Sequence, residues 1–375
     1  MKNEETERQE HHVIKVMPGI GAAPHQLARR LGARALLESA SFEDGRARYS
    51  LIMVDEAFRL LQEGRGVYST RPGEPEAVRY EGYTDILDAL HAIADRYAQP
   101  HQSFPFPAGG IGFLSYEFAR RCDRIRFIER EDPLGMPEAE FLFGHRFVIF
   151  DHKSGLIYLI GINYREHEID LPARMQELED SLTEVNGTAV YAVGGDVTDA
   201  EEPGTRGGSG TVSGRAVSGR SPQERELYLE HVRTIKGEIE AGNLLQAVLS
   251  RRVVFGSEME AIDAYARLRS ADPSPYHFYL DFGDTQLFGA SPEVHVSVKE
   301  GLTSMKPIAG TRRRGSSREE DLELESELME DPKERAEHLM LVDLARNDRG
   351  KVCAPGSVKV EEFMKIERFA RVMHI

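Results

Sequence analysis

The spacing of apolar residues divides the chain into helix and strand candidates. Ile86, Leu90 and Ile93 recur as they would on one face of a helix, which predicts an amphipathic helix from residue 80 to residue 97. The same reasoning predicts helices at 25–39, 172–185, 222–241 and 332–347, and strands at 13–17, 47–54, 140–151, 155–163, 189–193, 246–255, 274–282 and 285–298. Helices and strands alternate irregularly and several strand pairs are joined by short turns. This indicates an α+β fold of mostly antiparallel sheets with helices packed outside.

A stretch rich in glycine, serine and threonine lies near the middle of the chain. Its composition, over residues 194–222, is typical of a flexible linker or a surface excursion. We therefore predict an N-terminal region at residues 13–193, a linker at 194–222 and a second region at 223–375. The two regions could still interleave in space, because this boundary is read from sequence alone.

The charge balance and the cysteine count exclude several classes of protein. The chain carries 47 Lys and Arg against 63 Asp and Glu, a formal net charge of −16, so we expect no nucleic-acid partner and no membrane partner. Only Cys122 and Cys353 are present, which argues against a disulfide framework. The polar residues 1–12 lack the apolar run of a signal peptide, and no apolar span could cross a membrane. A cytoplasmic protein is expected.

The helix that begins at Pro332 carries a carboxylate on an apolar face. Asp331 is a suitable N-cap, Pro332 suits the first helical position, and nearly every residue from Ala336 to Ala345 is apolar, so the helix is expected to be covered on most sides. Glu337 shares a face with several of these apolar residues. A buried carboxylate needs a partner.

Two interpretations of Glu337 remain open from the residues alone. One is an ion pair with Arg346 or with a residue of the run Arg312–Arg314. The other is a ligand of a hard cation such as Mg²⁺. The arginine run itself is expected to form a solvated turn with at most one arginine facing inward.

Several motifs then occur in a family's order. They are LLES (36–39), GGIGFLSYE (109–117), AGNLLQAVLSRR (241–252), DPSPYHF (272–278), SPE (291–293), PIAGT (307–311), ERAEHLMLVDLARND (334–348) and VMHI (372–375). Together they resemble the chorismate-utilising enzymes, specifically the large subunit of anthranilate synthase. The resemblance covers most of the chain. It implies an enzyme of tryptophan biosynthesis, a lyase, that converts chorismate and ammonia to anthranilate and pyruvate.

The resemblance also implies site residues. Gly310 and Thr311 match the pair that contacts chorismate, and His374 matches a histidine beside the reacting ring. Without the resemblance, a histidine in an apolar strand is more simply a satisfied core residue. Glu337 matches a ligand of Mg²⁺, which is therefore the expected cofactor.

Two positions distinguish the reactions of this family. Aminodeoxychorismate synthases resemble this chain but carry a nucleophilic lysine at the position of Ala309, and the isochorismate and salicylate relatives carry a general-base lysine at the position of Gln246. Neither alanine nor glutamine can perform those steps. External ammonia remains as the nucleophile, which favours anthranilate synthase over the alternative, aminodeoxychorismate synthase component I.

The family's tryptophan feedback site is implied by two segments. Leu37 and Ser39 match its first half, and Pro275, Tyr276 and His277 match its second half. On its own, the first segment also fits the end of a helix packed into a core. His277 stands where the family often has methionine, which predicts an altered inhibitor affinity. A non-catalytic tryptophan-binding sensor is the alternative from another class.

The family pattern extends beyond Ile375, with further substrate contacts and a second metal ligand. We therefore expect the 375-residue chain to be inactive, or nearly so, by itself. No glutaminase motif surrounds Cys122 or Cys353, so the resemblance implies that a glutamine amidotransferase partner supplies the ammonia.

Overall fold

The structure is a computed structural model of the chain. It describes residues 11–38, 48–74, 76–99, 104–128, 134–192, 216–218, 221–272, 274–369 and 371–375, without the side chains of 185–192 and 216–218. These form two compact units, one of residues 1–192 with 264–375 and the other of residues 193–263. Most of the predicted linker lies outside the described residues, so its boundaries stay a prediction.

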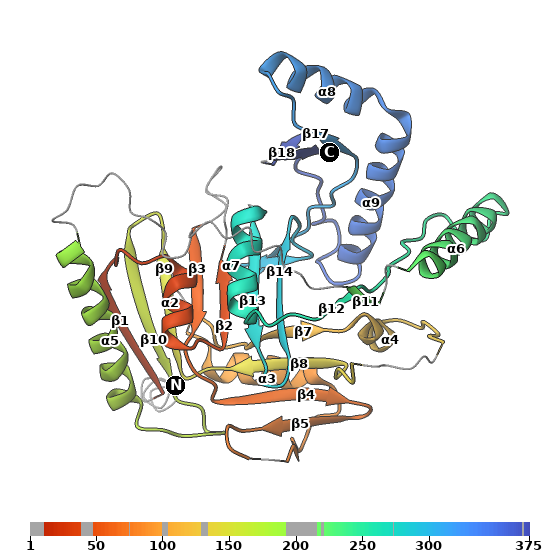
Figure 1. The fold of residues 1–375 in the computed structure, drawn as a ribbon. Helices are drawn as coiled ribbons and strands as arrows, with labels where there is room; N and C mark the ends of the chain where they lie inside the picture. Colours follow the sequence, from red (N-terminus) through yellow and green to blue (C-terminus); the bar gives the residue numbers. More distant parts are fainter. Residues whose placement is uncertain are drawn as a thin grey trace. The chain divides into compact units, whose positions relative to one another are not determined.

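The larger unit contains a seven-stranded sheet that draws on both halves of the chain (Figure 1). Its order is β1 (His12–Pro18), β10 (Leu156–Ile162), β9 (Arg146–Asp151), β3 (Tyr49–Met53), β2 (Ala35–Glu38), β13 (Tyr276–Asp281) and β14 (Gln286–Ser291). Every neighbouring pair is antiparallel. Strands from either side of the predicted boundary are therefore hydrogen-bonded to each other at β2 and β13.

A second sheet of five strands completes the N-terminal part. Its order is β6 (Val78–Arg79), β5 (Gly66–Thr70), β4 (Phe58–Glu63), β8 (Ala139–Phe143) and β7 (Ile111–Leu114). The helices of this part are α2 (Pro24–Leu31), α3 (Ile86–Tyr97), α4 (Ala119–Cys122) and α5 (Leu171–Ala192), with a 3₁₀ turn at Tyr116–Phe118; helix α7 (Ala261–Ala271) follows later in the chain. The predicted amphipathic helix forms as α3, but it begins at Ile86 and not at residue 80, because the Asp85 side chain caps it there.

The two sheets share one hydrophobic core. Met53 of the larger sheet, Phe58 and Phe143 of the smaller one, and Ile93 of α3 belong to the same cluster of buried side chains. Phe58 and Phe143 stack with ring centroids 4.5 Å apart, and Tyr164 meets Phe58 edge-on at 5.3 Å. This arrangement confirms the predicted α+β fold with antiparallel sheets.

Residues 297–375 of the larger unit contain the helix singled out in the sequence. A hairpin of β15 (Ser297–Lys299) and β16 (Leu302–Ser304) precedes a three-stranded sheet, in the order β17 (Thr311–Arg313), β19 (Val372–His374) and β18 (Glu367–Arg368). Helices α8 (Arg318–Glu330) and α9 (Pro332–Gly350) lie between β17 and β18 in sequence. Asp331 ends α8 and caps α9 through its side chain, as the sequence predicted.

The smaller unit contains α6 (Pro222–Glu240), β11 (Ala216–Ser218) and β12 (Val254–Phe255). The Ser221–Glu224 capping box that opens α6 is formed. The predicted buried strand at residues 246–255 is wrong, because only Val254–Phe255 pairs and both residues are exposed. In the described part of this unit no other strand is available to pair with residues 246–253.

Three further expectations from the sequence are corrected. The predicted helix at 25–39 ends at Leu31, because Gly32 adopts φ 61°, and residues 35–38 form strand β2 instead. The predicted strand at 189–193 is wrong, because residues 189–192 belong to the last turn of α5 and residue 193 lies outside the described residues. Helix α9 is not covered on most sides: Leu339 and Leu344 are 53% and 55% exposed, and His338 is its buried residue. Among the described helices, none is long and apolar enough to span a bilayer.

Candidate functional site

Two of the predicted site residues, Gly310 and Thr311, contact His374 near the pairing of β17 with β19, and Ala309 pairs with the next residue, Ile375. Thr311 is the register partner of His374 in this antiparallel pair. Just before β17, the backbone N–H and C=O of Ala309 exchange hydrogen bonds with Ile375, at 3.1 and 2.9 Å. Ala309 is 6% exposed, so its methyl group and both its backbone groups are engaged. The structure therefore brings residues 309–311 and 374 together.

The hydrogen bonds of His374 assign its tautomer. Its Nδ1 lies 2.9 Å from the carbonyl oxygen of Gly310 and 3.0 Å from Oγ1 of Thr311. A carbonyl oxygen can only accept, so Nδ1 must carry the hydrogen. The neutral imidazole then has its lone pair on Nε2. The edge of the ring also meets Phe369, with centroids 5.4 Å apart. This arrangement presents a base at Nε2.

Gly310 is required by both conformation and space. Its φ of 62° lies in the left-handed region, which favours glycine. A Cβ at this position would stand 2.9 Å from Cδ1 of Leu328 and 3.2 Å from Oε2 of Glu334. The carbonyl that holds His374 therefore sits in a tight turn packed against the α8–α9 corner.

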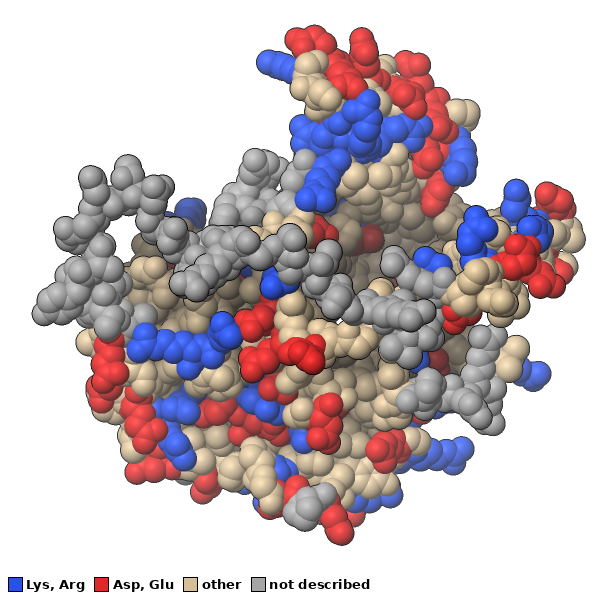
Figure 2. Space-filling view, in the orientation of Figure 1, with Lys and Arg blue, Asp and Glu red and all other residues tan. Residues whose placement is uncertain are grey.

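The arginine run after Gly310 is not a solvated turn with one residue inward. Arg312 donates from Nε to Glu327 at 2.8 Å and from Nη2 to Asp331 at 3.0 Å. Arg314 makes a bidentate pair with Asp321 at 2.9 and 3.0 Å. Both guanidinium groups are partly buried. In Figure 2, basic side chains gather beside the acidic ones of α8. The density of carboxylates on α8 explains why two arginines turn inward.

The predicted metal ligand Glu337 lies on α9, half-buried and followed by the buried His338. Glu334, one turn earlier, places its carboxylate next to the Gly310 turn, and its side chain is 16% exposed. In the described part of the chain, no group of three or more His, Cys, Asp or Glu side chains stands close enough to hold a metal by itself.

A carboxylate missed by the sequence reasoning borders the same turn. Oε1 of Glu293, from the SPE motif, accepts a hydrogen bond from the backbone N–H of Ile308 at 3.2 Å. Ile308 directly precedes Ala309, so the Glu293 carboxylate lies one residue from the turn. The motif contained this residue, but spacing along the chain could not show that it folds back on residue 308.

Gln246 is placed differently from the other predicted residues. It belongs to the smaller unit, in irregular chain between α6 and β12, and its side chain is exposed. The expected strand that would fix its direction is not formed. Its predicted role stays a prediction.

Three residues of the predicted inhibitor site lie on β2 and β13, namely Leu37, Tyr276 and His277, and Pro275 directly precedes β13. Leu37 pairs with Phe278, and Glu38 pairs with His277. Pro275 and His277 are buried, whereas Tyr276 is 43% exposed. Ser39 lies outside the described residues. The two segments, more than two hundred residues apart in sequence, are therefore neighbours in one sheet.

A buried ionic group lies beside this strand pair and was not predicted. The Glu38 side chain is 1% exposed, accepts from the Tyr265 hydroxyl at 2.5 Å and pairs with Arg269 at 2.8 Å. Burial raises the pKa of the Glu38 carboxyl, although Tyr265 and Arg269 oppose that shift. Burial and then Arg269 lower the pKa of His277, which faces Tyr265 edge-on. Arg269 and Tyr265 come from α7, a contact no local pattern reveals.

Comparison with known proteins gives a consistent set of similarities. A family model described as chorismate binding enzyme matches residues 57–375. The chain is 50% identical to anthranilate synthase component 1 of Spirochaeta aurantia, over 97% of this chain and 72% of that protein. It is 36% identical to aminodeoxychorismate synthase component 1 of Bacillus subtilis (strain 168), over 93% and 69%. The crystal structure of anthranilate synthase component I from Streptococcus pneumoniae TIGR4 matches with a TM-score of 0.62 at 29% identity, covering 89% of this chain and 69% of that one.

Proposed function

Because the chain belongs to the family of chorismate-binding enzymes, we propose that it is the large subunit of an anthranilate synthase. Identity of 50% to one such protein, against 36% to an aminodeoxychorismate synthase, supports this choice. In the proposed reaction, a C–N bond forms between ammonia and C2 of chorismate while the C4 hydroxyl leaves as water. The ring then loses its C2 proton and the enolpyruvyl group departs as pyruvate, which gives anthranilate.

The observation that carries the proposal is the fixed orientation of His374. Its Nδ1–H is held by the Gly310 carbonyl, so Nε2 has the free lone pair that can accept the ring proton. An imidazole suits this step because it is the side chain that most often takes or gives a proton in enzymes. The proton is thus removed by a group whose direction is set by the backbone.

Ala309 supports ammonia as an external nucleophile. Its buried methyl group offers no atom that could attack the ring, and its backbone groups are bound to Ile375. A covalent route through this position, as in the aminodeoxychorismate relatives, is therefore closed. The Gly310–Thr311 turn is the proposed contact for the substrate, since the absence of a Cβ lets a carboxylate approach the backbone closely.

Mg²⁺ is the proposed cofactor, and Glu337 would be its ligand from α9. When bound, the ion would neutralise the substrate carboxylate and orient the ring. Mg²⁺ usually takes one or two protein carboxylates and fills its other positions with water and substrate oxygens. A single half-buried carboxylate on this helix therefore fits such an ion.

We further propose a glutamine amidotransferase partner as the source of ammonia, and L-tryptophan as a feedback inhibitor. Leu37, Pro275, Tyr276 and His277 would form the inhibitor site, with Ser39. The buried carboxylate of Glu38 beside them offers an acceptor for an ammonium group.

The test is to incubate the full-length gene product with chorismate, Mg²⁺ and ammonium and to identify the product. Anthranilate fluorescence with stoichiometric pyruvate is expected, and tryptophan should inhibit it. Formation of 4-amino-4-deoxychorismate would instead support the second candidate. Calorimetric binding of tryptophan without binding or conversion of chorismate would show a sensor.

A further inference from the structure

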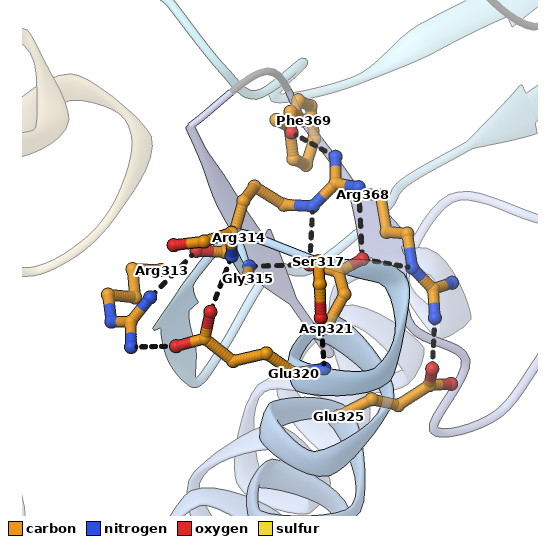
Figure 3. A network of polar contacts seen from close by, with 10 residues as sticks. Arg313, Arg314, Gly315, Ser317, Glu320, Asp321, Glu325, Arg368 and Phe369 are labelled. Carbon is orange, nitrogen blue, oxygen red and sulfur yellow. Dashed lines mark hydrogen bonds and ion pairs between the residues drawn. The ribbon is translucent and has the colours of Figure 1, made fainter.

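Asp321 joins the two outer strands of the three-stranded sheet (Figure 3). It stands in the first turn of α8 and is 8% exposed. Its Oδ1 accepts from Nε of Arg314 at 2.9 Å and from the backbone N–H of Gly315 at 2.8 Å. Its Oδ2 accepts from Nη2 of Arg314 at 3.0 Å and from Nε of Arg368 at 3.3 Å. One carboxylate therefore binds a residue that follows β17 and a residue within β18.

Both of these strands pair with β19, the strand that carries His374. Thr311 and Glu367, on opposite sides, are both register partners of His374. A carboxylate that ties the ends of the two flanking strands therefore limits how far β19 can shift between them.

A second path leads from Asp321 to the imidazole through Phe369. Nη1 of Arg314 donates to the carbonyl oxygen of Phe369 at 2.8 Å, and the N–H of Phe369 donates to Val372 at 2.8 Å. The Phe369 ring meets the His374 ring at 67°. Asp321 orients the Arg314 guanidinium, which holds the backbone of Phe369, and the Phe369 ring packs against His374.

The charges of the network are balanced, as a partly buried network requires. Arg314 and Arg368 face Asp321, and Arg368 also pairs with Glu325. Hydrogen bonds from Arg314 and from the Gly315 N–H hold the pKa of the Asp321 carboxyl well below its usual range. The carboxylate therefore stays ionised at any pH at which the enzyme would work. Loss of its charge would leave two guanidinium groups without their common acceptor.

We propose that Asp321 is a positioning residue for His374, which it orients through Arg314, Arg368 and Phe369 without touching the substrate. The role rests on the proposed function only in so far as His374 acts on chorismate. The simpler alternative is that Asp321 only attaches α8 to the three-stranded sheet. The two roles differ in whether loss of the Asp321 carboxylate changes the tautomer of the His374 imidazole.

The experiment compares Asp321→Asn with Glu319→Gln in the full-length protein. Asparagine keeps the size of the side chain but turns one acceptor into a donor that faces guanidinium N–H groups. Glu319 is exposed in the same turn of α8, so Glu319→Gln removes one negative charge from this turn and leaves the hydrogen bonds of the Asp321 network in place. Histidine labelled with ¹⁵N reports the state of His374, whose resonances are assigned by their loss in His374→Gln.

In the wild type and in Glu319→Gln, the ¹⁵N shifts of His374 are expected to show the Nδ1–H tautomer. In Asp321→Asn, we expect these shifts to move toward a mixture of tautomers, and kcat for anthranilate to fall on the order of tenfold or more while KM for chorismate stays within about twofold. Asp321→Glu should restore part of kcat. Unchanged His374 shifts in a folded Asp321→Asn protein, with only a lower Tm, would overturn the proposal.

The two proposals can fail separately. If the wild type makes no anthranilate, the proposed function fails, while the ¹⁵N shifts still decide whether Asp321 orients His374. If anthranilate forms normally in Asp321→Asn with His374 shifts as in the wild type, only the positioning role is overturned.

Discussion

Substitution of Gly310 by alanine tests whether the turn beside His374 is as tight as the structure shows. An alanine with φ near 62° costs roughly 1–2 kcal/mol because Cβ approaches the backbone carbonyl. The added methyl would also stand 2.9 Å from Cδ1 of Leu328, which is fully buried and cannot easily retreat. Overpacking of this kind costs typically 1–3 kcal/mol. The free energy of unfolding should therefore fall by about 2–5 kcal/mol.

Gly32 offers a matched control for this measurement. Its φ is 61°, but nothing lies within 4 Å of the position that a Cβ would take. Gly32→Ala should therefore lose only the conformational part, about 1–2 kcal/mol. Both variants would be unfolded in urea and followed by circular dichroism, with the slope m compared to show that the same surface is exposed. Equal losses in the two variants would refute the packing described around Gly310.

Three further outcomes are expected. His374→Gln should lower kcat by about 10²–10⁴-fold with little change in KM for chorismate, since it removes a base and not a binding contact. Steady-state kinetics would show a rise in KM instead if the His374 ring served only as a packing contact. Glu337→Gln should raise the Mg²⁺ concentration needed for half-maximal activity, whereas an unchanged Mg²⁺ titration would exclude Glu337 as a ligand. His277→Met should make the free energy of unfolding depend less on pH at the acid end. Burial lowers the pKa of His277, so below about pH 6.5 the unfolded wild type binds a proton that the folded state does not. The free energy of unfolding of the wild type should therefore fall there by at most about 1.4 kcal/mol per pH unit. The measurement is urea unfolding of both proteins between pH 5 and 8. If His277 did not cause the loss of stability at low pH, His277→Met would show the same pH dependence as the wild type.

Local patterns predicted the elements that have their own start signals. Asp331 with Pro332 and Ser221 with Glu224 set the starts of α9 and α6, and both helices form there. The α3 helix was predicted from periodicity because one of its faces packs on a sheet. These signals lie within a few residues of one another, so the sequence alone contains them.

The failures have a different physical origin. Residues 35–38 were predicted as helix because two leucines follow a helical stretch, but they pair on one side with β3 and on the other with β13, a strand more than two hundred residues away in sequence. Residues 246–253 read as a buried strand, yet a strand forms only where a partner is present. Pairing of this kind depends on tertiary contacts that periodicity does not encode.

Only some of the candidate site residues could be named from the sequence, because the others depend on tertiary contacts. The resemblance singled out Gly310, Thr311 and His374; Thr311 and His374 pair in the structure, and Gly310 directly precedes that strand and contacts His374. Asp321 was not among the predicted site residues. Its role in joining Arg314 to Arg368 depends on a fold-back of nearly fifty residues, which no spacing rule anticipates.

The most direct test of the proposed anthranilate synthase activity is to determine the ring position at which nitrogen enters. The full-length protein would be supplied with chorismate, Mg²⁺ and ¹⁵N-ammonium, and the product analysed by NMR. An anthranilate synthase should give ¹⁵N attached to the carbon next to the one that bears the carboxylate, together with one pyruvate for each anthranilate. Nitrogen on the carbon opposite the carboxylate would contradict it and identify the chain as an aminodeoxychorismate synthase.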